Sequence, residues 1–181
     1  GSRDADGGAG GAGAGAGASC VRAGSFFSMI RIGLISDTHG LMRPEALAFL
    51  EGSDFIVHGG DIGYAGILEA LARIAPLTVV RGNNDREAWA DRIAEIELVT
   101  FGDVRLYAIH DLAQIDIDPR AAGVRVVVSG HSHKPKVQER DGVLYVNPGS
   151  AGPRRFRLPI SVAELIVDGA AVTARVVLLD P

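Results

Sequence analysis

Seven side chains that can ligate a metal are spread through the sequence, and each follows an apolar segment within a few residues. Their carboxylate, imidazole and amide groups suit divalent ions such as Mn²⁺, Fe²⁺, Zn²⁺ or Ni²⁺. One zinc ion takes about four ligands, so this set is too large for a single ion and suits two ions that share a carboxylate. The candidate ligands are Asp37, His39, Asp61, Asn83, His110, His131 and His133.

A pair of divalent ions indicates a particular chemistry. Two ions about 4 Å apart can polarise a phosphoryl group and generate a hydroxide at neutral pH. Gly60, Gly82 and Gly130 adjoin candidate ligands, where they allow the backbone to turn sharply. These residue types and their neighbours favour metal-dependent hydrolysis of a phosphate ester.

The apolar segments before the candidate ligands are short and rich in Ile, Leu and Val, which is typical of buried strands. In the first half they alternate with helical patterns, and this alternation predicts parallel strands joined by crossover helices. The second half is mostly β. Predicted strands cover residues 29–35, 55–58, 77–80, 96–101, 104–109, 124–128, 142–146, 161–167 and 172–179, and predicted helices cover residues 44–51 and 65–75.

These elements predict an α/β fold in which two sheets pack face to face as a β-sandwich and helices cover the outside. Ligands in α/β folds gather beyond the carboxyl ends of the strands. If the strands share that edge, the candidate ligands converge there although they are far apart in the sequence.

The composition limits the class of protein. The 181 residues fit one domain: residues 1–28, rich in Gly and Ala, are expected to form a disordered tail, and residues 29–181 the domain. A net charge of −4 is poorly suited to sequence-independent nucleic-acid binding, which relies on Lys and Arg. The single cysteine, Cys20, excludes an internal disulfide, and no stretch approaches the roughly 18 apolar residues of a membrane span. We expect a cytoplasmic protein without a membrane partner.

The motifs that hold the candidate ligands resemble, in their order, those of the calcineurin-like metallophosphoesterase superfamily. The resemblance covers essentially all of residues 29–180, and the ordered set is specific although no single fragment is. Residues 36–40, 80–85 and 147–150, followed by Pro153-Arg154, are similar to the small bacterial and archaeal branch of compact phosphodiesterases. The shared motifs are Asp37-Thr-His39, Gly60-Asp61, Gly82-Asn83, His110 and Gly130-His-Ser-His133.

The resemblance implies how the ligands divide between two metal ions. Mn²⁺ is the expected metal, with Ni²⁺, Fe²⁺ or Zn²⁺ as alternatives, and a water or hydroxide between the ions is the implied nucleophile for in-line attack on phosphorus. One ion would take Asp37, His39 and His133, the other would take Asn83, His110 and His131, and Asp61 would bridge them.

One residue departs from the superfamily pattern. Many members have a His after the Asn of the third motif, where this chain has Asn84. Asn84 is a candidate catalytic residue and substrate contact, because its amide can hydrogen-bond a phosphoryl oxygen, but it is a poor proton donor. This weakens the case for substrates with poor leaving groups. Asp85 is the nearest carboxyl group that could move a proton as a catalytic residue, and a purely turn-forming role is its alternative.

Two further residue types have competing interpretations. Arg154 is the candidate contact for the substrate phosphate, and Arg81 and Arg155 could also meet it. All three could equally be solvated surface residues. His58 lies inside a predicted strand and is expected to be a hydrogen-bonded core histidine.

These observations leave three function classes open. The first is a metal-dependent phosphodiesterase that acts on a small phosphoester. The second is a non-catalytic scaffold, because the superfamily includes a retromer subunit of similar fold; ligand loss would indicate this class, and here no ligand is lost. The third is a phosphomonoesterase or nucleotide hydrolase, which shares the metal site. The resemblance alone implies a possible homo-oligomer.

Overall fold

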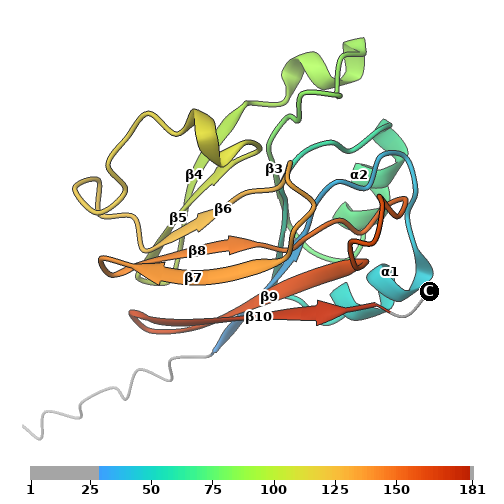
Figure 1. Cartoon of the computed structure of the whole chain (residues 1–181). Helices are drawn as coiled ribbons and strands as arrows, with labels where there is room; N and C mark the ends of the chain where they lie inside the picture. The colour runs from blue at the N-terminus through green and yellow to red at the C-terminus, as the bar shows by residue number, and fades with distance from the viewer. Residues whose placement is uncertain (1–28, 180–181) are drawn as a thin grey trace, which may run out of the picture.

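The computed structural model describes residues 29–179, which form two five-stranded sheets packed face to face (Figure 1). The tail predicted at residues 1–28 lies outside the described residues. The predicted α/β sandwich is confirmed. Within residues 29–179, no helix has the length and apolar character needed to cross a bilayer.

The first sheet is built around parallel strands. Crossover connections containing the helices α1 (Pro44–Leu50) and α2 (Ala65–Ala72) join them, as expected for βαβ units. The last two strands form an antiparallel pair that extends the sheet at one side. Its order is β10 (Ala171–Leu178), β9 (Ser161–Asp168), β1 (Ile30–Ile35), β2 (Phe55–His58) and β3 (Leu77–Val79).

The second sheet contains the predicted hairpin of residues 96–101 and 104–109 at one edge. Its three central strands are parallel, so their carboxyl ends face the same way. A second hairpin forms the other edge. Its order is β4 (Ile96–Phe101), β5 (Val104–Ile109), β6 (Val126–Val128), β8 (Val143–Asn147) and β7 (Lys136–Arg140).

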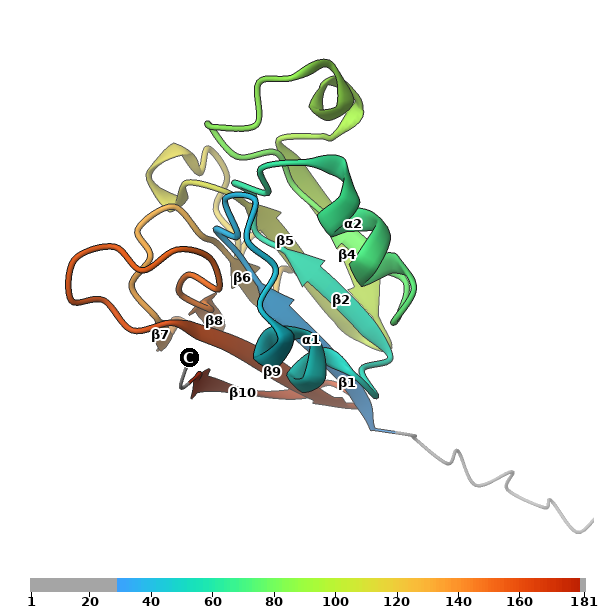
Figure 2. The ribbon, with the colours of Figure 1, turned by 90° about the vertical axis from the view of Figure 1, so that its right-hand side faces the viewer.

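Alternation along the strands creates separate apolar layers, because successive side chains point to opposite faces. In β1, Ile32 and Leu34 belong to the core between the sheets, with Val128 of β6. Ile35 belongs to a second core, in which the first sheet packs against Leu50 of α1 and residues of α2. Figure 2 shows both helices over this outer face of the sheet.

The outer face of the second sheet is covered differently. The segment between β5 and β6, which includes the short 3₁₀ helix η2 (Leu112–Gln114), packs there against the sheet. Leu112 and Ile115 contact a cluster that contains Tyr107 and Val127. The helices therefore flank one side of the sandwich, and an irregular segment closes the other.

Strand β7 is the one strand of residues 29–179 that the sequence patterns missed. Its residues, Lys136 to Arg140, are mostly exposed because β7 is an edge strand, so they lack the alternation that marks a buried face. The 3₁₀ helix η1 (Ala88–Arg92) was also not predicted. The helix predicted at 65–75 ends at Ala72, since Pro76 disfavours a helical Ala75. The strand predicted at 124–128 begins at Val126, and other bounds agree within one residue.

Candidate metal centre

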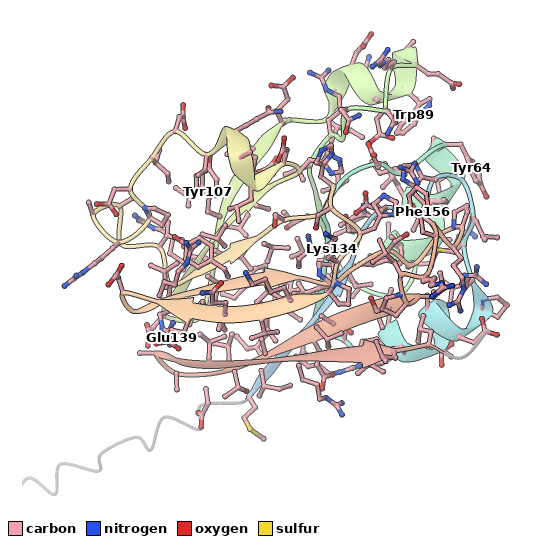
Figure 3. All side chains as sticks on the ribbon, in the orientation of Figure 1. Tyr64, Trp89, Tyr107, Lys134, Glu139 and Phe156 are labelled. Carbon is pink, nitrogen blue, oxygen red and sulfur yellow. The ribbon has the colours of Figure 1, made fainter. Side chains whose placement is uncertain are left out.

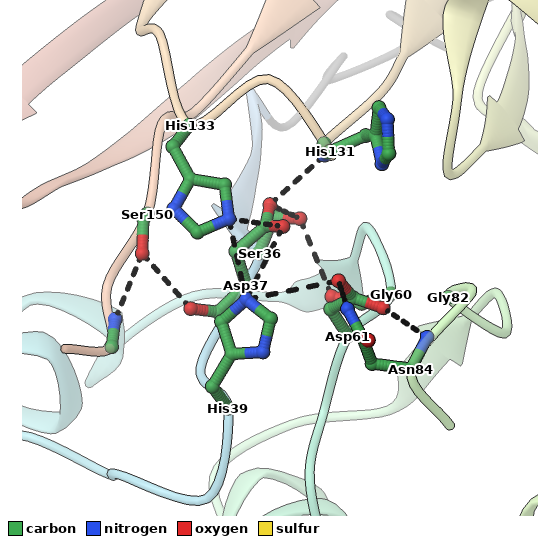
Figure 4. A network of polar contacts seen from close by, with 12 residues as sticks. Ser36, Asp37, His39, Gly60, Asp61, Gly82, Asn84, His131, His133 and Ser150 are labelled. Atoms are coloured by element: carbon green, nitrogen blue, oxygen red, sulfur yellow. Dashed lines mark hydrogen bonds and ion pairs between the residues drawn. The ribbon is translucent and has the colours of Figure 1, made fainter. Parts of the chain in front are cut away.

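The candidate ligands converge at one edge of the sandwich, where the carboxyl ends of parallel strands from both sheets meet. Backbone hydrogen bonds fasten the loops together: Asp37 donates its N–H to the carbonyl of Gly60 at 2.9 Å, and His39 donates to that of Asp61 at 2.9 Å. From the second sheet, Gly130 donates to the carbonyl of His110 at 2.9 Å. Figure 4 shows side chains from these loops pointing toward a common centre.

The backbone at this edge has an unusual conformation. Five of the seven candidate ligands have a positive φ: Asp37 (54°), His39 (44°), Asp61 (55°), His131 (65°) and His133 (57°). Residues other than glycine adopt this left-handed region rarely, at a cost of about 1–3 kcal/mol each. Such strain persists where it aims a functional side chain, and its concentration here independently marks the site.

Glycines allow the loops to approach one another closely. A Cβ atom on Gly82 would collide with the backbone nitrogen and carboxylate of Asp61, and one on Gly130 would collide with the hydroxyl of Ser36. The first collision involves backbone, and the hydroxyl in the second is fully buried and held by its hydrogen bond to Asp37. These two positions therefore require glycine for the sake of space.

The first group of ligands consists of Asp37, His39 and His133. Nε2 of His133 lies 3.1 Å from Oδ1 of Asp37 and 3.2 Å from Nε2 of His39, which is 3.9 Å from the same Oδ1. Donor atoms that share one ion through bonds of about 2.1 Å are separated by about 3–3.5 Å. Oδ1 of Asp37 and Nδ1 of His133 are buried without any hydrogen-bond partner in the described chain.

The second group contains Asn83, His110 and His131. Oδ1 of Asn83 lies 3.1 Å from Nε2 of His110 and 3.1 Å from Nδ1 of His131. The other ring nitrogen of His110, Nδ1, is 2.7 Å from the carbonyl of Gly59 and carries the proton that this bond requires. Nε2 is therefore the nitrogen that faces the centre and would offer its lone pair to an ion once its own proton is displaced, as in metal sites where a backbone acceptor holds the other nitrogen.

Asp61 lies between the two groups. Its Oδ2 is 3.7 Å from Nε2 of His39 and 3.4 Å from Nε2 of His110. Burial opposes ionisation of Asp61, but hydrogen bonds from His110 and Asn84 outweigh it and hold the pKa of this carboxyl well below its usual range. A carboxylate that stays ionised and faces both groups is suited to the bridging position implied by the resemblance.

Burial and the nearby carboxylates also set the pKa values of the histidines. Burial lowers the pKa of His39, with the carboxylates of Asp61 and Asp37 opposing. Burial acts on His110 in the same direction, but the hydrogen bond with Asp61 outweighs it and raises the pKa of His110. A divalent ion would displace a proton at this position, because a histidine ligand must be neutral at the ligating nitrogen.

The residues present fit divalent metal ions. The ligand atoms of Asp37, His39 and His133 lie within 4.8 Å of one another, as do those of Asp37, Asp61 and His110. The buried Oδ1 of Asp37 is the strongest indication, since a polar oxygen without a hydrogen bond is costly to bury. The mixture of nitrogen and oxygen donors is the one that suits Mn²⁺, Fe²⁺, Ni²⁺ or Zn²⁺.

Asn84 and Asp85 occupy different positions, although they are adjacent. Asn84 donates its backbone N–H to Oδ1 of Asp61 at 2.9 Å and its side-chain amide to Oδ2 at 2.6 Å, so it is at the centre. The buried carboxylate of Asp85 accepts backbone N–H groups from Ile62, Gly63 and Gly82 at 2.8, 3.1 and 2.9 Å. Asp85 thus holds together the loops that carry Asp61 and Asn83, in the manner of a turn residue.

Of the arginines considered as phosphate contacts, Arg155 is the one that reaches the centre. Its Nη2 lies 3.3 Å from Nε2 of His39. Arg154, the sequence-based choice, makes no side-chain hydrogen bond or ion pair within residues 29–179 and is exposed. Arg81 pairs with Glu95 at the surface.

Asn147 and Ser150 also position the site, a role that sequence analysis did not assign. Nδ2 of Asn147 donates to the carbonyl of Gly130 at 2.7 Å, and Oγ of Ser150 donates to the carbonyl of Asp37 at 2.9 Å. The segment 147–150 therefore braces two of the ligand loops. Its similarity to the small phosphodiesterase branch was the only signal in the sequence that could have pointed to it.

His58 is a hydrogen-bonded core histidine, as predicted. Its Nδ1 accepts the N–H of Gly60 at 3.1 Å, and its Nε2 lies 3.0 Å from Oγ1 of Thr38. That hydroxyl already donates its proton to the carbonyl of Ile62 at 2.8 Å, so Nε2 must be the donor to Thr38. Complete burial lowers the pKa of His58 to about 4 and keeps it neutral.

Two archaeal proteins are similar to this chain in sequence over most of their length. A "Probable metallophosphoesterase" of Methanothermobacter thermautotrophicus is 35% identical over 158 residues, which cover 81% of this chain and 91% of that protein. A phosphodiesterase of Methanocaldococcus jannaschii is 25% identical over 138 residues, covering 66% of this chain and 83% of its own length.

Solved structures show the same fold at lower sequence identity. An archaeal phosphodiesterase superposes with a TM-score of 0.69 and 22% identity, over 82% of this chain and all of that one. Vps29 of Chaetomium thermophilum superposes with a TM-score of 0.68 and 20% identity, over 83% of this chain and 97% of that one.

The sequence pattern of the calcineurin-like phosphoesterase superfamily domain matches residues 30–169, most of the described chain. This match agrees with the fold and with the ligand loops at its edge. The chain belongs to the calcineurin-like phosphoesterase superfamily.

Proposed function

We propose that this protein is a phosphodiesterase with two divalent metal ions, Mn²⁺ being the first choice. The observation that carries the proposal is the position of Asp61, whose Oδ2 faces His39 of one ligand group and His110 of the other. When bound, two such ions supply a nucleophile from water at neutral pH and neutralise charge on the phosphoryl oxygens. The mildly acidic domain meets its anionic substrate through this centre.

The protein's own side chains contribute binding and orientation. The amide of Asn84 uses one N–H on Asp61, and its second N–H can donate to a phosphoryl oxygen. Arg155 places a guanidinium beside His39, where it can pair with the same phosphate. Neither group is a proton donor for the leaving group, and both oxygens of Asp85 are engaged by backbone N–H groups. The arrangement supports cleavage of esters whose leaving group departs as an anion.

The first test is hydrolysis of bis(p-nitrophenyl) phosphate by metal-stripped protein titrated with Mn²⁺. We expect added metal to restore turnover in the wild type. Asp61→Asn should lower kcat/KM at least about a thousandfold, because several kcal/mol of charge stabilisation depend on the ions that Asp61 holds. Asp103→Asn, at the exposed turn between β4 and β5, is the matched control and should behave as the wild type.

Comparison of p-nitrophenyl phosphate with the diester tests specificity on the same protein. A kcat/KM that is higher for the monoester would replace the phosphodiesterase proposal with a phosphomonoesterase. No turnover of either ester by protein with bound Mn²⁺ would favour the scaffold function, to which the similarity to the Vps29 fold gives some support.

A further inference from the structure

Phe156 is the most unusual surface residue of the described chain. Its side chain is 93% exposed, more than that of any other large apolar residue in positions 29–179. Its φ is +54°, in the left-handed region, which is a genuine outlier for a bulky aromatic residue. The other residues of this kind are five candidate metal ligands and Asp141 of the β7–β8 turn. Backbone strain at a residue that holds its aromatic ring in solvent indicates that the ring binds a ligand.

The position of Phe156 ties it to the metal centre. It directly follows Arg155, whose guanidinium lies 3.3 Å from Nε2 of His39, and consecutive Cα atoms are about 3.8 Å apart. Phe156 also lines an open hollow of about 920 Å³ together with Ser132 and Lys134. Ser132 and Lys134 alternate in sequence with the ligands His131 and His133. Figure 3 labels Phe156 and Lys134 on the same side of the molecule.

The charge around this hollow is positive, in contrast to the rest of the protein. The connection from β8 to β9, residues 148–160, contains Arg154, Arg155 and Arg157 and no acidic residue, whereas the whole chain has a net charge of −4. Arg157 and Lys134 line the hollow itself. An anion is therefore attracted to this side of the metal centre.

We propose that Phe156 is a stacking platform for a nucleobase, so that the substrate is a small phosphodiester of a nucleoside. This inference rests on the proposed phosphodiesterase function. With the phosphate at the metal centre beside Arg155, a nucleoside attached to it extends over residues 156–158, and its base lies on the phenyl ring. Base–aromatic stacking is a substantial and sequence-tolerant interaction.

The chemistry and the size of the substrate follow from the same residues. Hydrolysis breaks one P–O bond: the hydroxyl of water goes to phosphorus, the leaving group departs as an anion with the bonding electron pair, and the proton of the water passes to solvent, leaving a nucleoside monophosphate. Among residues 29–179, Phe156 is the one large apolar side chain that is almost fully exposed, and the chain as a whole has a net charge of −4. A substrate with one or two nucleotides fits these facts, whereas a polynucleotide needs a longer basic track.

The test compares two diesters with the same leaving group in the Mn²⁺-loaded protein. These are the p-nitrophenyl ester of thymidine 5′-phosphate and methyl p-nitrophenyl phosphate. We expect the wild type to prefer the thymidine ester by about tenfold in kcat/KM. Phe156→Ala should remove most of this preference, chiefly through KM, and Phe156→Trp should keep it. Leu178→Ala, an exposed apolar residue on β10, is the control and should match the wild type with both esters.

A second readout separates this inference from the proposed function. Calorimetry measures binding of thymidine 5′-monophosphate and of deoxyribose 5-phosphate to the wild type and to Phe156→Ala. If neither ester is cleaved but the wild type binds the nucleotide about tenfold more tightly than Phe156→Ala does, the platform stands and the hydrolase function fails. The platform is overturned if Phe156→Ala lowers kcat/KM equally for both esters, or if neither assay shows a preference for the ligand with a base. Either result leaves the proposed phosphodiesterase function intact.

Discussion

Two buried carboxylates in the first sheet have opposite surroundings. Glu164 of β9 accepts hydrogen bonds from Nε of Arg31 at 2.7 Å and from Nε of Arg175 at 2.8 Å. The Nη1 and Nη2 atoms of Arg31 donate to the backbone carbonyls of Glu51 and Phe49. Asp37, just beyond β1, is fully buried with an unpartnered Oδ1, a left-handed backbone and two histidine nitrogens nearby. The first cluster is satisfied by protein atoms alone, and the second is not.

The difference indicates what each cluster does. Buried polar groups in native proteins are almost always paired, because an unpaired one costs about 1–3 kcal/mol. A satisfied network such as that of Glu164 contributes to folding and leaves nothing for a ligand. An unsatisfied one, built on a strained backbone, is retained where a bound group completes it. Both ring nitrogens of His58, which lies beside the centre, have hydrogen-bond partners. Closeness to the centre therefore does not by itself leave a polar group unpaired.

The largest expected effect is on catalysis. Asp37→Asn should lower kcat/KM for bis(p-nitrophenyl) phosphate about a thousandfold, since it removes the charge of a metal ligand. Glu164→Gln should leave kcat/KM within about twofold per folded molecule, because both oxygens of Glu164 are already engaged by Arg31 and Arg175. Steady-state kinetics with metal content measured in parallel checks both. Similar losses in the two variants would erase the functional distinction between the clusters.

The next effect concerns pH. Because the pKa of His58 is lowered from 6.5 to about 4 in the folded state, the unfolded chain binds the proton more readily. Stability is then complete above about pH 6.5 and is lost as the pH falls toward 4, by about 3 kcal/mol. Urea unfolding of metal-free protein across this range measures the loss.

His58→Gln isolates this contribution from the other histidines. His39 has a lowered pKa and adds to the same slope, whereas His110 has a raised pKa and opposes it. The variant should show a flatter dependence of the unfolding free energy on pH. An unchanged slope would mean that His58 does not stay neutral in the folded protein.

A smaller effect on stability is expected in the cluster of Glu164, Arg31 and Arg175. Burial alone would raise the pKa of Glu164, but the hydrogen bonds from Arg31 and Arg175 lower it, so its stabilisation is present above its unfolded pKa and is lost in acid. Glu164→Gln should reduce the free energy of unfolding at neutral pH by about 2 kcal/mol. Glu139→Gln, in the exposed pair with Arg125, should cost less than about 0.5 kcal/mol. Urea titration of both variants measures the difference, and equal costs would contradict it.

The smallest expected effect is the change in unfolding free energy caused by Asp37→Asn. It separates the two clusters most clearly, because its sign should depend on whether metal is bound. Without metal, Asp37→Asn should raise the free energy of unfolding by about 1 kcal/mol, because its amide can donate to Nε2 of His133 and no carboxylate oxygen is then buried without a hydrogen bond. With saturating Mn²⁺, the wild type should become the more stable protein, since it binds the ion in its folded state. Thermal unfolding with chelator and with Mn²⁺ tests the crossover, which should be absent in Glu164→Gln.

The agreement between sequence and structure is uneven for a physical reason. The ligand loops were predictable because each follows a buried apolar strand, and strand direction places all the loops at one edge. Strand β7 was not, because an exposed edge strand carries no alternating pattern. The bracing role of Asp85 was not visible either, since three backbone donors from two loops converge on it only after folding.

The sequence by itself determined the set of candidate ligands, the sandwich of two sheets and the superfamily, because these depend on residue type, order and hydrophobic pattern. Only the tertiary structure decided that Asp61 lies between the two groups, that Oδ1 of Asp37 is left unpartnered, and that Arg155 instead of Arg154 reaches His39. Those facts depend on distances between residues far apart in the chain, which local patterns do not encode.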